Sequence, residues 1–429
     1  MGRTPPVGRS RHGLWWGETL GCVFCAAALC AVVLGVTSPA CAFWETERDA
    51  VYAEARGFVR GAVLFAENPP DRLLYANPSD GSGQIAARLF GELELDPVLA
   101  VQANVLYTGA TTTRTGLALA TPELDSNRSS ALRWNARTRA TSAHAVEVDW
   151  LSVRLTLGAQ GPHPVDVRVG RLPINLATTF YFTPNDFFSP FSADTFFRSY
   201  KPGVDGARVD FQLADLTQVS LIGVAGFAPD DDSPRLGKTA GLARVSTSAW
   251  DLEWVALAGV IPDRAVAGGA LQGEIFSWLG VRGEGHYAWG LDDNTDRVEL
   301  VLGIDHRFES TLTLRGEQFY HGSGSTSVEG YARALTDPGS TGLYLGRHYS
   351  AFGAGYELTP LLVVDAFSLV NWGDRSGLWG SNLLYSLGDE AEVAFVVTAP
   401  WGADPKLPTV GSEFGLYPAT ASVDFRAWF

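Results

Sequence analysis

The sequence predicts an all-β fold: about 18 antiparallel strands that run up and down and close into a transmembrane β-barrel. Three observations predict it. The last eleven residues alternate between apolar and polar side chains, which gives a strand one apolar and one polar face. Candidate strands follow one another with short and long connections in alternation. The composition, with 47 Gly, 23 Phe, 13 Trp and 13 Tyr, favours strands with interfacial aromatic rings over a helical core.

The closing strand is the stretch Ala419 to Phe429. A last strand that pairs with the first leaves no free edge, so every backbone group of the sheet is satisfied inside a bilayer. The terminal Phe429 resembles the end of bacterial outer-membrane β-barrels, where it also serves as an insertion signal. An amphipathic edge strand of a soluble sheet is the alternative.

Residues 1–42 have the pattern of a secretory signal peptide. Three Arg residues precede an apolar run from Leu20 to Val36, and Ala40 and Ala42 fit cleavage before Phe43. A transmembrane anchor is a weaker alternative because polar residues follow at once. Lipid attachment at Cys41 ranks lower still, since Ser38 stands where lipoprotein signals usually have Leu.

The mature chain, residues 43–429, contains no cysteine, because all four cysteines lie in the leader. It therefore forms neither disulfides nor a thiolate metal site. Cleavage lowers Lys plus Arg from 32 to 29 and Asp plus Glu from 47 to 46, a net charge of −17. A chain this acidic repels phosphates, so we expect no binding to nucleic acid.

Eighteen segments of the mature chain are candidate strands by their periodicity and by the turn residues between them. They are 51–65, 83–95, 98–108, 145–158, 165–171, 204–213, 218–227, 239–247, 250–260, 270–276, 278–289, 297–308, 311–321, 348–358, 362–371, 378–387, 392–399 and 419–429. Sixteen strands stay an alternative, because the tight junctions between residues 250 and 289 can gain or lose a pair.

The connections between these segments sort into two sets. Tight connections lie at 96–97, 159–164, 214–217, 248–249, 277, 309–310, 359–361 and 388–391. Longer ones lie at 66–82, 109–144, 172–203, 228–238, 261–269, 290–296, 322–347, 372–377 and 400–418. With the N-terminus in the periplasm, all tight turns face the periplasm and all longer loops face outward, as in outer-membrane barrels. A soluble sandwich or propeller is not expected to sort its connections this way.

Charged side chains of both signs share the polar faces of several strands. A barrel of this size is too wide for side chains alone to fill, so they would line a water-filled interior. The lumen-lining candidates are Arg168, Arg208, Asp210, Arg282, Glu284, Arg315 and Glu317. Facing acidic and basic rows would orient polar solutes, and ion-pair ladders that only stiffen the wall are the alternative.

The connection 172–203 is too apolar for a free external loop. It holds seven Phe and two Tyr, and Pro184, Pro190 and Pro202 argue against further strands. We expect this loop to fold inward and pack against the wall, where it narrows the lumen.

This loop, with Val204-Asp-Gly-Ala-Arg208 after it and the stretch Gly411 to Pro418, resembles a group of largely uncharacterised porin-like barrels of Gram-negative bacteria. The resemblance spans most of the mature chain, and its motifs mark a type of barrel, not a substrate. It implies a set of pore-constriction candidates, namely Asp186, Asp194, Arg198 and Lys201. An aromatic plug or a membrane belt without solute contact is the alternative for this block.

Patterns of catalytic residues do not emerge from the sequence. The mature His residues are scattered without a recognisable Ser or carboxylate partner, and a lumen-lining role explains the shared face of Glu284 and His286 as well as catalysis does. No HExxH motif, Walker-type loop, calcium-binding repeat or haem-attachment Cys pair occurs. We therefore expect no enzymatic activity, no cofactor and no metal site.

By this reasoning the chain is expected to be a channel in the cell outer membrane through which small hydrophilic solutes diffuse. A dedicated uptake or export channel, for a polysaccharide or an apolar compound, is one alternative. A non-conducting structural or adhesive barrel is another. The expected partners are outer-membrane lipid and lipopolysaccharide, the barrel insertion machinery and small polar solutes. Analogy with sixteen-stranded porins leaves a homotrimer open.

Overall fold

The computed structural model describes residues 44–48, 51–113, 124–139, 141–197, 200–228, 231–291, 295–336, 344–406 and 409–429. The predicted signal peptide, residues 1–42, lies outside the described residues. Among the described residues, no helix is long and apolar enough to cross a lipid bilayer.

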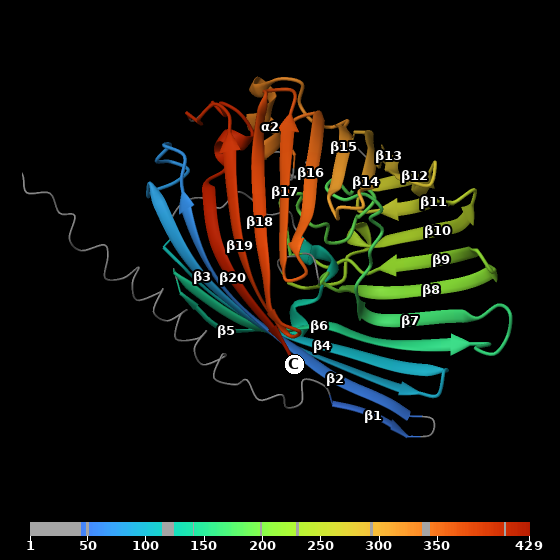
Figure 1. Cartoon of the computed structure of the whole chain (residues 1–429). Coiled ribbons are helices and arrows are strands. Elements are labelled where there is room, and N and C mark those ends of the chain that lie inside the picture. Colours follow the sequence, from blue (N-terminus) through green and yellow to red (C-terminus); the bar gives the residue numbers. More distant parts are fainter. Residues whose placement is uncertain are drawn as a thin grey trace, which may run out of the picture.

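The described chain is built almost entirely from antiparallel strands (Figure 1). The strands are β1 (Trp44–Arg48), β2 (Val51–Glu67), β3 (Ser79–Leu95), β4 (Leu99–Thr112), β5 (Arg133–Arg139), β6 (Ser142–Leu157), β7 (Val165–Leu172), β8 (Val204–Ala214), β9 (Thr217–Val224), β10 (Ala240–Ala249), β11 (Leu252–Ile261), β12 (Arg264–Ile275), β13 (Leu279–Gly290), β14 (Arg297–Arg307), β15 (Thr313–His321), β16 (His348–Thr359), β17 (Leu362–Asn371), β18 (Ser376–Gly388), β19 (Ala391–Trp401) and β20 (Ala419–Trp428). One short α-helix, α2 (Tyr331–Thr336), and five 3₁₀ turns, Leu124–Asn127, Ser130–Leu132, Leu236–Lys238, Val328–Gly330 and Phe414–Leu416, lie in the loops.

The strands close into a ring. From β2 to β4 and from β6 to β20 each strand pairs with the next, β4 pairs with β6, and β20 pairs with β2 from Phe58↔Trp428 to Glu67↔Ala419. That ring has 18 strands, so the predicted fold class and strand number are confirmed, and the alternative of 16 is not. The backbone N–H of Phe429 donates to the carbonyl of Gly57 at 2.9 Å, which extends the closing pair by one residue.

Two further strands lie outside the ring's sequence of pairs, and the sequence analysis missed both. β1 pairs with the first residues of β2, below the point where β20 has ended. β5 pairs with residues 142–147 of β6, beyond the end of β7 at Leu172. Each covers a length of strand edge that the ring itself leaves unpaired.

The two faces of the wall differ as the alternation predicts. On β14, Leu300, Leu302 and Ile304 point outward and are 45%, 58% and 56% exposed, whereas the alternate residues Glu299 and Val301 are buried on the inner side. Exposed aromatic residues mark both rims, for example Trp289 and Trp401 at loop ends and Trp250 and Phe276 at tight turns. An apolar outer band between two aromatic girdles is the form that suits a strand wall in lipid.

One predicted long connection is wrong. The segment 261–269 was expected to be a loop, but β12 begins at Arg264, so only two residues separate β11 from β12. Arg264, Gly268 and Gly269 lack the apolar alternation of a strand, yet they complete the ladder with β11 and β13. Pairing with two long neighbours overrides the weak local preference.

The buried core lies inside the ring, where loops pack on the inner wall. One cluster joins Leu172, Ile174, Leu176 and Phe188 to wall residues from β8 to β13. A second joins Tyr181 and Phe182 to wall residues such as Phe319, Tyr349 and Phe367 and to Phe414. The loops that enter the ring therefore supply the packing that a soluble protein would have between its layers.

Candidate functional site

The loop between β7 and β8, residues 173–203, lies inside the ring (Figure 1). Its first part packs against β8 to β13, and Tyr181 and Phe182 then pack beside β15 to β17. This loop is the segment from which the sequence analysis drew its constriction candidates, and we call it the inner loop.

Glu284 of β13 holds the first turn of the inner loop. Its carboxylate accepts hydrogen bonds from the backbone N–H groups of Thr178 at 2.5 Å, Thr179 at 3.3 Å and Asn185 at 3.2 Å. The side chain is only 2% exposed. A buried carboxylate needs such donors, because a charge without partners would be costly in this environment.

Glu317 of β15 makes an equivalent set of contacts with the next residues. It accepts from the N–H groups of Phe180 at 2.5 Å, Tyr181 at 2.9 Å and Phe182 at 3.1 Å. Two predicted lumen-lining carboxylates thus bind backbone amides of the inner loop. Period-two alternation predicts that both carboxylates lie on the inner face, whereas no local pattern predicts the loop that they hold.

Phe180 packs between two arginines of the same wall. The guanidinium carbons of Arg282 and Arg315 lie 4.2 Å and 4.7 Å from the centre of its ring. Arg282 also donates to the carbonyl of Thr178 at 3.1 Å and approaches Asp305 at 3.4 Å. These contacts fix the position of the ring, since arginine stacks well on aromatic faces.

The second half of the inner loop crosses to the wall where the barrel closes. The Phe196 ring lies 5.1 Å from Phe367 of β17. The Phe197 ring lies 4.0 Å from the guanidinium of Arg426 on β20, and Tyr200 lies 4.9 Å from that of Arg88 on β3. The inner loop therefore contacts wall segments around much of the circumference.

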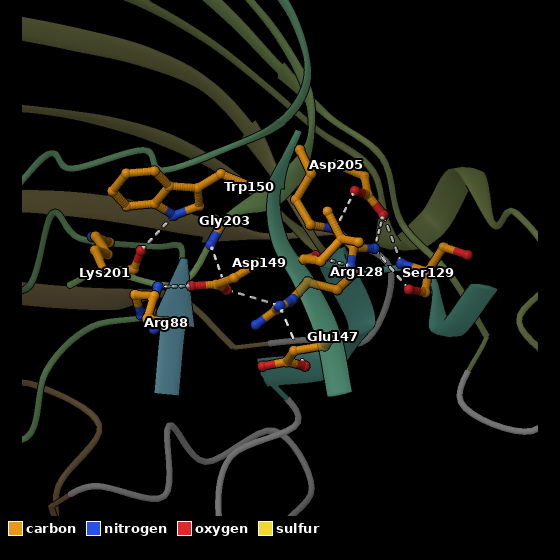
Figure 2. Close-up of polar contacts among 11 residues, drawn as sticks. Arg88, Arg128, Ser129, Glu147, Asp149, Trp150, Lys201, Gly203 and Asp205 are labelled. Atoms are coloured by element: carbon orange, nitrogen blue, oxygen red, sulfur yellow. Dashed lines mark hydrogen bonds and ion pairs between the residues drawn. The ribbon is translucent and has the colours of Figure 1, made fainter. Parts of the chain in front are cut away.

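Charged contacts fix the end of the inner loop, as Figure 2 shows. Asp149 of β6 accepts from Arg88 at 2.5 Å, from Arg128 at 3.0 Å and from the backbone N–H of Gly203 at 3.4 Å. The indole N–H of Trp150 donates to the carbonyl of Lys201 at 3.0 Å. At the other end, Arg171 makes a bidentate contact with Asp205 at 2.7 and 2.8 Å.

The four constriction candidates divide into three cases. Asp186 and Lys201 form an ion pair with each other and are 4% and 8% exposed, so the pair ties two distant parts of the inner loop together. Burial raises the pKa of the Asp186 carboxyl and lowers the pKa of the Lys201 ammonium, and the pairing opposes both shifts. Asp194 is half-buried and accepts from the Ser192 hydroxyl. Arg198 lies outside the described residues.

The other lumen-lining candidates lie on β7 and β8. Cross-strand pairing places Arg154, Arg168 and Arg208 side by side on β6, β7 and β8. Arg154 contacts Glu94 at 2.6 Å and Arg208 contacts Asp210 at 2.9 Å. Among the described residues Arg168, between them, makes no ion pair or hydrogen bond. We call these three residues the arginine row.

Glu413 is a functional candidate that the sequence analysis did not single out, although it lies in the quoted stretch Gly411 to Pro418. It is 2% exposed and accepts from the backbone N–H of Leu345 at 3.1 Å, the hydroxyl of Tyr349 at 2.5 Å and the amide of Asn371 at 2.6 Å. Burial raises the pKa of Glu413 to about 7. It joins the loops 322–347 and 402–418 at the loop end of the barrel.

A second missed group is Ser323, His321 and Glu299. The Nδ1 atom of His321 lies 2.9 Å from a Glu299 carboxylate oxygen, and its Nε2 atom lies 3.1 Å from Oγ of Ser323. The His-Gly-Ser spacing was the only sequence signal, since Glu299 comes from another strand. No group of three His, Cys, Asp or Glu in the described chain is arranged to hold a metal ion.

No protein-family profile and no curated protein matches the chain. Solved structures do match. A BenF-like porin from Pseudomonas fluorescens Pf-5 aligns with a TM-score of 0.55 and 12% identity over 88% of this chain and 98% of that one. Pseudomonas aeruginosa OccK7 (OpdD) gives 0.53 and 10%, and OccK2 (OpdF) in complex with glucuronate gives 0.52 and 10%, each over 88% of this chain and 98% of its own.

At these identities the likeness is one of fold. It extends over nearly the full length of the neighbours, so it covers the whole ring and not a fragment of sheet. The predicted resemblance to porin-like outer-membrane barrels is confirmed at that level: the chain has the 18-stranded β-barrel fold of these porins.

Proposed function

We propose that the chain is an outer-membrane porin through which small hydrophilic solutes diffuse, with the inner loop setting the size limit. The observation that carries the proposal is the closed ring, which has an apolar outer face, charged inner side chains and one long loop held against its inner wall. A ring of this kind satisfies its backbone in lipid and offers polar groups to a solute inside.

The proposed location is the outer membrane, after export and cleavage near Ala42. The aromatic residues at both rims and the terminal pairing of Phe429 with Gly57 suit insertion there by the barrel assembly machinery. Diffusion through such a channel requires no catalytic group, and the neighbour from Pseudomonas fluorescens Pf-5 is named a BenF-like porin.

A preference for anionic solutes is the second candidate. The arginine row supports it, because Arg168 makes no ion pair within the described chain and is therefore available to a passing carboxylate or phosphate. The neighbour OccK2 (OpdF) was solved in complex with glucuronate. Under this second candidate function the chain is a channel specific for anionic substrates and not a general porin. Arginine suits such substrates because its guanidinium group can make two parallel hydrogen bonds to a carboxylate.

Planar-bilayer conductance of the purified mature chain tests these possibilities. Steady ohmic steps are expected from a porin. Blockade by organic acids such as uronates, with no blockade by neutral sugars, would favour the anion-specific channel. The absence of any conductance would overturn the proposal and favour a non-conducting structural barrel.

A further inference from the structure

Three polar side chains at the loop end of the barrel form a connected chain of hydrogen bonds. Glu299 contacts Nδ1 of His321 at 2.9 Å, and Nε2 of the same ring contacts Oγ of Ser323 at 3.1 Å. Acid, base and hydroxyl in this order, each within hydrogen-bond reach of the next, are the recognised geometry of an activated serine nucleophile.

The fold fixes these positions. Glu299 and His321 are directly paired residues of β14 and β15, so their side chains leave the sheet on the same face within reach of each other. His321 also begins a tight turn that the backbone N–H of Gly324 closes on the carbonyl of His321 at 3.0 Å. The turn brings the Ser323 hydroxyl back over the imidazole ring, and Gly322 and Gly324 flank it.

The charge of Glu299 decides which nitrogen of His321 carries the proton. An ionised carboxylate only accepts hydrogen bonds, so the Nδ1 atom must donate to it. In neutral imidazole Nε2 then has a free lone pair and accepts from the Ser323 hydroxyl. This is the tautomer that a general base requires.

Burial and access also suit a nucleophile. His321 and Glu299 are 2% and 8% exposed, whereas Ser323 is exposed to solvent. Within the described chain, no acceptor pairs with the backbone N–H of Ser323. The nucleophile's own N–H is one of the donors that stabilise an oxyanion in serine hydrolases.

We propose that Ser323 and His321, with Glu299 as a positioning residue, hydrolyse short-chain carboxylic esters at the mouth of the barrel. The Oγ atom attacks the ester carbonyl while its proton passes to Nε2 of His321. The bond to the alcohol then breaks, the imidazolium returns the proton to the leaving alkoxide, and an acyl ester of Ser323 remains. In the second step a water molecule attacks the acyl carbonyl while Nε2 of His321 takes its proton. The bond between the acyl carbon and Oγ then breaks, the imidazolium returns that proton to Oγ, and the carboxylic acid leaves.

Labelling of the detergent-purified mature chain with a fluorophosphonate probe tests the proposal, with the labelled residue identified by mass spectrometry. Ser323 is expected to be labelled, and the Ser323→Ala variant is expected to remain unlabelled. The His321→Gln variant should react at least about a hundredfold more slowly than the unchanged chain. Ser325→Ala and His348→Gln are the matched controls and should label like the unchanged chain. Heat-modified migration on gels checks that every variant is folded.

Glu299 is tested through the dependence of labelling on pH. Glu299→Gln should slow labelling and change the pH profile, because the imidazole loses the carboxylate that fixes its Nδ1 proton and stabilises the imidazolium formed during attack, and Glu299→Asp should recover part of the rate. No labelling of the folded chain, labelling at another residue, or equal rates in His321→Gln would overturn the proposal. Conductance is measured separately on the same preparations. An absence of conductance would overturn the porin proposal but would not change what the labelling result says about Ser323.

Discussion

Glu284 and Glu317 show how single residues give the lumen its shape. Each is a wall carboxylate that accepts three backbone N–H groups of the inner loop. Hydrogen bonds to a charged group are each worth roughly 1.5–3 kcal/mol when the alternative is an unsatisfied group. Together these residues hold residues 178–185 against β13 and β15.

Replacing Glu317 with Ala should release this part of the inner loop. All three charge-assisted hydrogen bonds to Glu317 are lost, so the docked state is weakened by about 2 kcal/mol or more. Single-channel conductance should rise, and proteolysis within 173–203 should become faster. Glu357→Ala is the matched control. Glu357 is exposed on the inner wall near a tight turn, and its ion-pair partner within the described chain is Arg307. Equal conductance in the two variants would contradict this role.

Gly353 is a position where the wall must have no side chain. A Cβ atom there would lie 1.7 Å from the hydroxyl of Tyr181, so Gly353→Ala must displace that ring from the inner loop's packing. The variant should fold but show altered or noisier conductance and a lower unfolding temperature. Gly61→Ala serves as control, since a Cβ there meets nothing within 4 Å. Identical behaviour of the two variants would show that Tyr181 moves without consequence.

Sequence reasoning identified the inward direction of these side chains but not their partners. Period-two alternation put Glu284 and Glu317 on the inner face, since side chains on alternate positions share a face. The contact of Glu284 with Thr178 joins residues 106 apart in the chain, and nothing local in the sequence predicts it. The same limit applies to Glu299 and Ser323, which come from different elements and are connected through His321.

At the scale of elements, the loops 322–347 and 402–418 dock on each other through Glu413. Its folded-state pKa of about 7 lies above the ordinary value of 4.5, so the docked state binds a proton more tightly than the undocked state. Docking is therefore most stable below about pH 4.5 and loses stability, on the order of 3 kcal/mol, as pH rises to about 7. Other titratable groups that surround it are Asp374, Tyr349, Tyr331 and Tyr417.

Limited proteolysis of the 402–418 loop checks this pH dependence. Cleavage should accelerate as pH rises from about 5 to 7, and Glu413→Gln should remove the acceleration, because the amide does not titrate in this range. If the unchanged chain and the Glu413→Gln variant are cleaved at the same rate at every pH, Glu413 is not the titrating group.

The arginine row makes a prediction for strands β6 to β8. Arg168→Gln removes the member of the row that has no ion-pair partner among the described residues. Anion over cation permeability, measured from reversal potentials in a salt gradient, should fall, while Arg307→Gln at a distant and exposed site should leave it unchanged. An unchanged ratio in both variants would remove the support for an anion-specific channel.

The elements themselves were largely predictable. Alternation and the sorting of short and long connections identified all 18 strands of the ring. The short β1 and β5 were missed because five and seven residues carry too weak a pattern. The start of β12 was missed because its stability comes from pairing with β11 and β13 and not from its own residues.

At the scale of the whole molecule, the barrel supplies a closed apolar exterior and the inner loop supplies the interior packing. The predicted mature chain carries a net charge of −17, yet its arginines gather on the inner face beside acidic partners. The proposed size limit therefore depends on a loop that the sequence marks by its excess of aromatic residues and by its prolines. The loop's path around the wall follows from contacts with strands from all parts of the chain.

The conductance of a chain that lacks residues 176–198 tests this account most directly. The deletion removes all the residues whose backbone amides Glu284 and Glu317 bind, and leaves every strand of the ring intact. Larger ohmic steps than those of the full mature chain are predicted, because the lumen loses its constriction. Unchanged step size in a folded deletion variant would contradict the central claim that the inner loop limits passage.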